Sequence, residues 1–553
     1  MKKYTLLFAA LLLAGSILHA QPALVKKAAK SVFTLTTFKA DSTVLATTHG
    51  VFIDNSGTAL SPFAPFVGAA RATITTADGN NLDVDYILGG NELYDYCKFH
   101  VDARTTGTPL AMTPPKTGSE VWLPDYNGKA TTAKALKVKS VEKFNTQYNY
   151  YIFDGLAPDD AYGCPVLNGA GLVMGLLHQN ANGAYAADAN FGNSLKVNGL
   201  TTLDPALRRT RIRTALPDNE KDAEMALALA QTRFGNDVMK KYAREFIQKF
   251  PSQTVGYKQL ADLCLATGDL AGADEAMRQS LAQSTEKDVA HSNYADIIYR
   301  KLSYMPDTPF EPWNADKALE QIEAAIQLNP SSIYQHQKGQ ILYLKGDYQQ
   351  AYDIFVTLGA KDMKTGEIYY EAAQCKSHLK APREEILKLL DQSVNNSPKN
   401  QLGAPYFLAR GQMLDAMGRY RDAIADYNVY DSITTTYRGA ASPEFYYTRY
   451  KCAKNGHQWQ LALNDIAHAA LLDRTNPTYF AELASLELRV KRFDDAVVAA
   501  TRCTELAPDY ADGWLLLGLA QLQLGKKKEA AEPLEKAKAL GDSRAEEYLH
   551  QLK

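Results

Sequence analysis

The most constraining feature of this 553-residue chain is a spacing that recurs in its C-terminal part: a glycine followed five residues later by an alanine. The clearest instances are Gly268 with Ala273, Gly346 with Ala351, Gly418 with Ala423, and Gly525 with Ala530. A small residue stands seven positions before each of these glycines, namely Ala261, Gly339, Gly411 and Gly518. Glycine adopts turn conformations that side chains resist, and small residues let two helices approach closely. The spacing therefore predicts a repeated helix–turn–helix unit.

Other units keep the same register less strictly. Lys491 precedes Ala496 with the glycine replaced, and Gly456 precedes Ala462 with one residue added. Many units end near a proline, at Pro251, Pro330, Pro398, Pro477 and Pro508. The best copy reads "DGWLLLGLAQLQLGKKKEAAEPLEKAKAL" and carries Trp514, Leu517, Gly518, Gly525 and Ala530 at its marked positions.

This pattern resembles the tetratricopeptide repeat, a helix–turn–helix unit of about 34 residues. The resemblance reaches from residue 218 to residue 540 and implies an all-α solenoid over residues 218–553, with roughly nine helix pairs and an insertion at residues 305–313. Stacked repeats form an extended concave surface that binds other molecules. We therefore expect a protein or peptide ligand in the solenoid groove.

The N-terminal part has a different sequence pattern. Short β-branched or alternating runs such as "SVFTLTT" and "ATITT" are separated by turn signals such as "DNSG" and "DGNN". Many short strands with frequent turns predict an all-β barrel or sandwich, over residues 21–198. Residues 199–217 are expected to form a linker helix. The linker contains Arg208, Arg209, Arg211 and Arg213, which we interpret as the solvated face of a helix packed between the domains rather than as an anion site.

Three segments of this part follow one another in an informative order. "HGVFIDNSGTALSPFAPFVGA" has Gly50, Phe52, Ile53, Gly57 and Leu60 in the register of a protease motif. "DYILGGNELYDYCKFHVD" matches a second motif at Gly89 and Asp95, and "DDAYGCPVLNGAGLVMGLL" matches a third at Gly163, Pro165 and Val166. Together the segments resemble the trypsin-like serine proteases, especially the HtrA type. The resemblance implies a chymotrypsin-like double barrel.

The same resemblance assigns the three triad positions to Ala64, Asp95 and Tyr162. A serine triad needs a hydroxyl nucleophile, an imidazole that takes its proton and a carboxylate that orients the imidazole. Alanine cannot accept a proton, and a phenol without a base is no substitute for serine. We therefore expect a pseudoprotease with no enzymatic activity, although its barrel alone would suggest a serine peptidase. Tyr162 is expected to fill the space of the substrate carbonyl, and Asp95 to bind backbone amides or Tyr162.

Two alternatives stay open for this pocket. Cys164 replaces a glycine of the motif and could act as a nucleophile with His49 as its base. His100 is a poorer base because strand alternation turns it away from Asp95. Cys97 and Cys164 could form a disulfide or remain as free buried thiols. The other four cysteines, Cys264, Cys375, Cys452 and Cys503, stand at apolar positions of predicted helices, where a buried free thiol is expected.

Length, charge and the N-terminus narrow the class of protein further. The formal net charge is −2, which favours neither nucleic acid nor an anionic membrane as a partner. Residues 1–20 read as a secretory signal with cleavage after Ala20 and no lipid-anchor cysteine, so we expect export, most simply to a bacterial periplasm. No other segment is apolar enough to span a membrane. Cofactor and metal motifs are absent from the sequence, so none is predicted.

These observations predict an exported interaction scaffold that joins an inactive trypsin-like domain to a protein-binding solenoid. The alternative is an active serine-type or cysteine-type peptidase with a non-standard site. A third possibility is a glycan-binding protein that uses exposed aromatic side chains. The sequence leaves the partner and the oligomeric state open.

Overall fold

The structure is a computed structural model that describes residues 22–126 and 133–552. The predicted signal at residues 1–20 lies outside the described residues. The chain divides into two compact units, residues 1–290 and residues 291–553, and each is described by itself. Among the described helices, none combines the length and apolar character needed to cross a bilayer.

The first unit begins with a short helix, α2 (Ala23–Ala28), and continues as β-structure. Its strands are β1 (Val32–Phe38), β2 (Val44–Phe52), β3 (Thr58–Ser61), β4 (Arg71–Thr76), β5 (Asn81–Asp83), β6 (Tyr86–Asn91), β7 (Tyr96–His100), β8 (Glu120–Leu123), β9 (Lys134–Phe144), β10 (Tyr148–Asp154), β11 (Pro165–Leu167), β12 (Val173–Asn180) and β13 (Gly183–Asp188). Helix α3 (Ala189–Ser194) follows the last strand.

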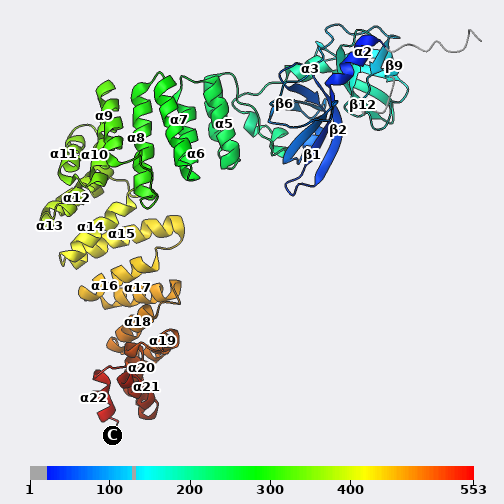
Figure 1. The fold of residues 1–553 in the computed structure, drawn as a ribbon. Helices are drawn as coiled ribbons and strands as arrows, with labels where there is room; N and C mark the ends of the chain where they lie inside the picture. The colour runs from blue at the N-terminus through cyan, green and yellow to red at the C-terminus, as the bar shows by residue number, and fades with distance from the viewer. Residues whose placement is uncertain (1–21, 127–132, 553) are drawn as a thin grey trace, which may run out of the picture. The chain divides into compact units, whose positions relative to one another are not determined.

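These strands form two bodies, as the double-barrel prediction requires (Figure 1). The first is a seven-stranded sheet in the order β5-β4-β1-β2-β3-β7-β6, and the second is a closed barrel in the order β10-β13-β12-β11-β8-β9. The sheet is filled by phenylalanines, Phe33, Phe52, Phe63, Phe66 and Phe99. The barrel is filled by side chains that include Val121, Tyr151, Cys164, Val166 and Met174. The all-β prediction is confirmed, with the first body an open sheet rather than a closed barrel.

The predicted linker helix at 199–217 is wrong. This segment contains two single turns of 3-10 helix, Thr201–Leu203 and Leu207–Arg209, and then runs extended beside β6. Ile87 donates its backbone amide to the carbonyl of Arg213 at 2.9 Å and accepts from the amide of Ala215 at 2.8 Å. The backbone of the segment is therefore satisfied by pairing with the sheet, which a helix could not do.

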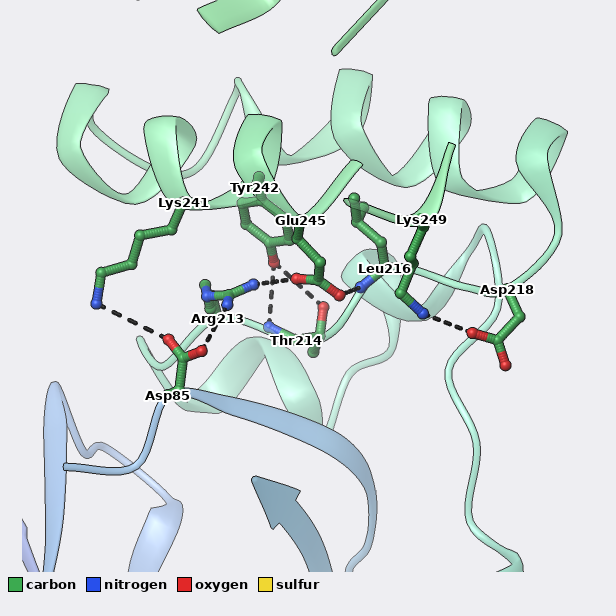
Figure 2. Close-up of polar contacts among 9 residues, drawn as sticks. All are labelled: Asp85, Arg213, Thr214, Leu216, Asp218, Lys241, Tyr242, Glu245 and Lys249. Carbon is green, nitrogen blue, oxygen red and sulfur yellow. Dashed lines mark hydrogen bonds and ion pairs between the residues drawn. The ribbon is translucent and has the colours of Figure 1, made fainter. Parts of the chain in front are cut away.

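Arg213 fastens this extended segment to the first repeats, so it is not a solvated residue (Figure 2). Its side chain is 6% exposed and pairs with Asp85 at 3.0 Å and with Glu245 of α5 (Asn236–Lys249). Glu245 also accepts from the amide of Leu216 at 2.8 Å. Burial alone would lower the pKa of Arg213, but the charges of Glu245 and Asp85 raise it above its ordinary value. These contacts join the extended segment to α5 within the first unit.

The rest of the chain is helical (Figure 1). The further helices are α4 (Glu220–Ala230), α6 (Thr254–Ala266), α7 (Leu270–Gln283), α8 (Lys287–Tyr304), α9 (Ala315–Leu328), α10 (Ser332–Lys345), α11 (Tyr348–Ala360), α12 (Gly366–His378), α13 (Arg383–Asn395), α14 (Ala404–Ala416), α15 (Tyr420–Arg438), α16 (Pro443–Asn455), α17 (Trp459–Leu472), α18 (Pro477–Arg489), α19 (Phe493–Leu506), α20 (Ala511–Gln523), α21 (Lys527–Ala539) and α22 (Arg544–His550). In chain order, helices α4 to α21 make nine pairs within the described residues, as the spacing predicted.

The turns within these pairs use the left-handed conformation that the glycine spacing predicted. The φ angles are +76° at Gly268, +96° at Gly346, +74° at Gly418 and +76° at Gly525. Lys491 takes the same place at +63°. In the unit with an apparent extra residue, the left-handed position is His457 at +57° rather than Gly456, which restores the five-residue interval to Ala462.

The small residues seven positions earlier mark close helix contacts. A Cβ added to Gly339 would lie 2.6 Å from the ring of Phe355, and one added to Gly518 would lie 2.6 Å from Leu534. Both distances are shorter than any comfortable carbon contact, so the first and second helices of these pairs could not pack as they do with a larger residue there.

Candidate functional site

The three triad positions named from the sequence come together where the sheet meets the barrel. Asp95 lies in the turn between β6 and β7 with a φ of +52°, a conformation that aspartate tolerates better than most residues. One carboxylate oxygen accepts from the backbone amides of Phe63 at 2.8 Å and Ala64 at 2.7 Å. The side chain of Ala64 is exposed and offers no polar atom beside the carboxylate.

Tyr162 is the hydrogen-bond partner of the second carboxylate oxygen of Asp95. Its hydroxyl donates to the other carboxylate oxygen at 2.5 Å. The loop is held by β2, because the carbonyl of Tyr162 accepts from the amide of His49 at 3.2 Å and from the hydroxyl of Thr48 at 2.9 Å. Asp95 thus binds both backbone amides and Tyr162, which confirms the prediction for this carboxylate. The phenol makes the hydrogen bond to the carboxylate that an imidazole would make in a triad.

Burial, and after it the hydrogen bond to Asp95, raises the pKa of Tyr162 well above its ordinary value. The hydroxyl is therefore kept as a donor, since ionisation would set two negative charges against each other. A protonated phenol that points at a carboxylate is a stable hydrogen bond and a poor nucleophile.

His178 of β12 is the residue that the sequence reasoning missed. Its Nδ1 lies 3.6 Å from Asp95, and its ring meets that of Tyr162 edge to face with centroids 5.4 Å apart. It is 7% exposed, and within the described part of the chain its Nε2 has no hydrogen-bond partner. Burial lowers the pKa of His178, and the charge of Asp95 opposes that change. The pocket therefore holds an imidazole beside Asp95, but the hydroxyl of Tyr162 is directed to the carboxylate.

The alternative nucleophile, Cys164, lies in the barrel core and is fully buried. Burial raises the pKa of this thiol well above its ordinary value, and the charges of Asp160 and Asp125 raise it further. Reactive cysteines sit in electropositive, partly exposed surroundings that favour the thiolate. The environment of Cys164 is the reverse of this.

The remaining candidates have structural contacts. His49 packs against the ring of Tyr126 with centroids 4.8 Å apart, and burial lowers its pKa. His100 stacks on Tyr86, and its Nε2 donates a hydrogen bond to the carbonyl of Ser56 at 3.0 Å. Cys97 and Cys164 are both free and buried, so the disulfide alternative is excluded in this structure. The four cysteines of the helices are also free and buried, as predicted.

A second candidate region lies on the first helices of successive pairs in residues 291–553. Side chains join α8 to α10 through Ser292 and Gln337 at 2.7 Å, and α10 to α12 through His336 and Glu371 at 2.6 Å. The rings of Tyr370 on α12 and Tyr406 on α14 lie 5.3 Å apart. We call the half-buried side chains His336, Tyr343, Tyr370, Glu371 and Tyr406 the first-helix face. A continuous strip of aromatic and polar groups is the composition that binding surfaces favour.

The comparison with known families concerns a later helix pair, α20 and α21. Residues 511–540 match the family model of the tetratricopeptide repeat. A curated relative from Saccharomyces cerevisiae, small glutamine-rich tetratricopeptide repeat-containing protein 2, is 33% identical over 78 residues. That match covers 14% of this chain and 22% of the relative, so this chain spans less than a quarter of the length of the relative.

Solved structures similar to part of this chain include the two that follow. They are the HtrA-type protease AlgW with a tripeptide and a variant of it with a tripeptide. Each is 17% identical, covers 31% of this chain and 60% of the solved chain, and has a TM-score of 0.27. The sheet-and-barrel architecture given above rests on strand pairing and not on this similarity.

Replacing Tyr162 with phenylalanine is expected to weaken the junction between sheet and barrel by about 1–3 kcal/mol, because the hydroxyl bonds a charged, half-buried carboxylate. The expected result is faster hydrogen exchange in residues 155–165, measured by mass spectrometry. Tyr437→Phe, at a tyrosine that is 54% exposed, serves as the control and should change nothing. Unchanged exchange in Tyr162→Phe would show that the hydrogen bond to Asp95 does not hold this loop.

Proposed function

We propose that this protein is an exported interaction scaffold whose trypsin-like domain does not cleave peptides and whose tetratricopeptide region binds a protein or peptide. The observation that carries the proposal is the occupation of Asp95. Its two oxygens are taken by the amides of Phe63 and Ala64 and by the hydroxyl of Tyr162. The carboxylate that would orient a catalytic imidazole therefore joins the Phe63–Ala64 backbone to Tyr162.

The binding part of the proposal rests on the helical repeats and the first-helix face. Tyrosines that are half-buried in the free protein lose little conformational freedom when a partner covers them, and they offer both apolar area and a hydrogen-bonding group. The absence of a strong net charge favours a partner recognised by such contacts rather than by long-range attraction.

A peptidase with a non-standard site is the second candidate, and His178 beside Asp95 is the observation that favours it. Such an enzyme still needs a nucleophile that can reach His178, and the candidate named from the sequence, Cys164, is fully buried in the barrel core. We expect the intact protein to release no product from casein or from fluorogenic peptides beyond the level seen with its Cys164→Ala and His178→Ala variants. Turnover that either substitution abolishes would establish the peptidase and overturn the scaffold.

The binding surface is tested by capture of partners on the immobilised intact protein. A combined Tyr370→Ala and Tyr406→Ala variant should lose the partner that the unaltered chain retains. Tyr437→Ala, on α15 and outside the first-helix face, is the matched control. If all three proteins retain the same partner, the first-helix face is not the binding surface.

Export is part of the same proposal and has an independent test. The signal predicted over residues 1–20 should be removed, so that the mature protein purified from a bacterial host begins at Gln21. N-terminal sequencing of the protein recovered from the periplasmic fraction gives the answer. A protein that retains Met1 and remains in the cytoplasmic fraction would contradict export but leave the binding proposal untouched.

A further inference from the structure

Two members of the first-helix face, His336 and Glu371, form with the exposed Glu367 a group of side chains that could hold a transition-metal ion. His336 on α10 and Glu367 and Glu371 on α12 each direct a ligand atom to one place, and these atoms all lie within 4.8 Å of one another. Glu367 and Glu371 are four residues apart on one helix, which puts them on the same face. His336 faces them from the neighbouring pair, where its Nε2 is 2.6 Å from Glu371.

We propose that His336, Glu367 and Glu371 bind a single Zn²⁺ ion that bridges α10 and α12. One imidazole nitrogen and two carboxylates are a ligand set that zinc accepts, with a fourth place left for water. The imidazole disfavours calcium and magnesium, which take oxygen ligands. No sequence motif predicted the site, because its ligands come from two helices and His336 is about thirty residues before the two glutamates.

The geometry needs only a small adjustment. Zinc lies about 2.0–2.2 Å from nitrogen and carboxylate ligands, so tetrahedral ligands stand roughly 3.3–3.5 Å apart. The His336 and Glu371 atoms are closer than this and can open to admit the ion. The side chain of Glu367 is exposed and free to swing inward.

The neighbouring residues keep the two inner ligands in position. Gln340, one turn after His336, donates its amide to the second oxygen of Glu371 at 2.8 Å. The ring of Phe355 lies edge to face against His336 with centroids 5.9 Å apart. In the folded chain, the side chains of His336 and Glu371 are only 13% and 16% exposed. Outer contacts of this kind orient metal ligands and raise the affinity of a site.

The competing explanation is a simple ion pair between a protonated His336 and the two carboxylates. It predicts no zinc binding beyond what scattered surface groups give. The two explanations therefore differ in the number of zinc ions bound per chain and in the effect of substituting Glu367. Because Glu367 is exposed, its substitution is expected to leave folding unchanged.

The test is isothermal titration of the metal-free intact protein with ZnCl₂, repeated with CoCl₂ while the absorption spectrum is recorded. We expect one site per chain, and Co²⁺ bands of a four-coordinate or five-coordinate ion. His336→Ala and Glu371→Gln should each weaken zinc binding at least tenfold, and Glu367→Gln should weaken it several-fold. Glu384→Gln and His550→Ala, at exposed positions of α13 and α22, are the matched controls and should bind as the unaltered chain does.

A thermal shift keeps the result interpretable if a variant is less stable. Zinc should raise the melting temperature of the unaltered protein and of both controls, because a ligand that binds only the folded state stabilises it. The rise should be smaller for Glu367→Gln at the same concentration, because its affinity for zinc is expected to be lower. Absence of a saturable site, or equal affinity in the unaltered protein, Glu367→Gln and His336→Ala, would overturn the proposal.

Discussion

Replacing Arg449 with methionine is expected to lower the local free energy of unfolding of α16 and α17 by about 3–5 kcal/mol, since it leaves an uncompensated buried charge. Arg449 holds Asp465 with two hydrogen bonds, at 2.9 Å and 2.8 Å, and Asp431 at 2.9 Å. Its side chain is 7% exposed and that of Asp465 is 3% exposed. Without the guanidinium, Asp465 must stay charged in an apolar setting or take up a proton.

The measurement is hydrogen exchange of peptides from α16 and α17, because a repeat chain of this length does not unfold in one step. Arg419→Met is the control, since Arg419 and Asp422 form an ion pair in which both side chains are about half exposed. The double variant Arg449→Met with Asp465→Leu should recover part of the loss, because it removes the stranded carboxylate. Equal protection in Arg449→Met and the unaltered chain would show that the pair does not stabilise these helices.

The second large effect is expected at Arg213, which pairs with Asp85 and Glu245 (Figure 2). Arg213→Met should also cost about 3–5 kcal/mol locally, because Glu245 is only 10% exposed and would lose its partner. The expected readout is rapid protease cleavage within residues 199–217 and faster hydrogen exchange in α4 and α5.

Arg211 provides a matched control in the same segment, because its side chain is exposed. Arg211→Met should keep the protease resistance of the unaltered protein. Glu245→Leu combined with Arg213→Met should be more resistant than Arg213→Met alone. Cleavage that begins equally fast in the Arg211 and Arg213 variants would mean that the backbone pairing with β6, and not the buried charges, protects the segment.

The sequence predicted the structure best where a fold feature depends on residues close together in the chain. The turn glycines and the small residues before them predicted the helix pairs. The glycines act through the left-handed backbone conformation, and the small residues through the close approach of the two helices within one unit. His457 shows the limit of that reasoning: the structure puts the left-handed turn one residue after Gly456. The spacing to Ala462, and not the glycine itself, was the reliable signal.

The triad positions could be predicted because three segments occur in a fixed order, and the structure brings Ala64, Asp95 and Tyr162 together. His178 could not, since nothing in "GLLHQN" indicates that β12 of the barrel packs its imidazole against a carboxylate from the sheet. The linker was wrong for the same reason. Arg213 is neutralised by Asp85, 128 positions earlier, and by Glu245, 32 positions later, and no local pattern reports such partners.

The pairing of residues 213–215 with Ile87 of β6 decides where this molecule can be divided. A recombinant fragment that ends at Pro217 would keep Asp85 beside Arg213 but would lose Glu245. It would also expose Leu216, which is buried against side chains of α4 and α5, and we expect that apolar surface to lower its solubility. A fragment that ends after α7 keeps the contacts of Arg213 with α5 and cuts through no helix. The same contacts would disfavour recombination that transfers the β-domain without the first repeats. We therefore expect the β-domain and the first repeats to be inherited together.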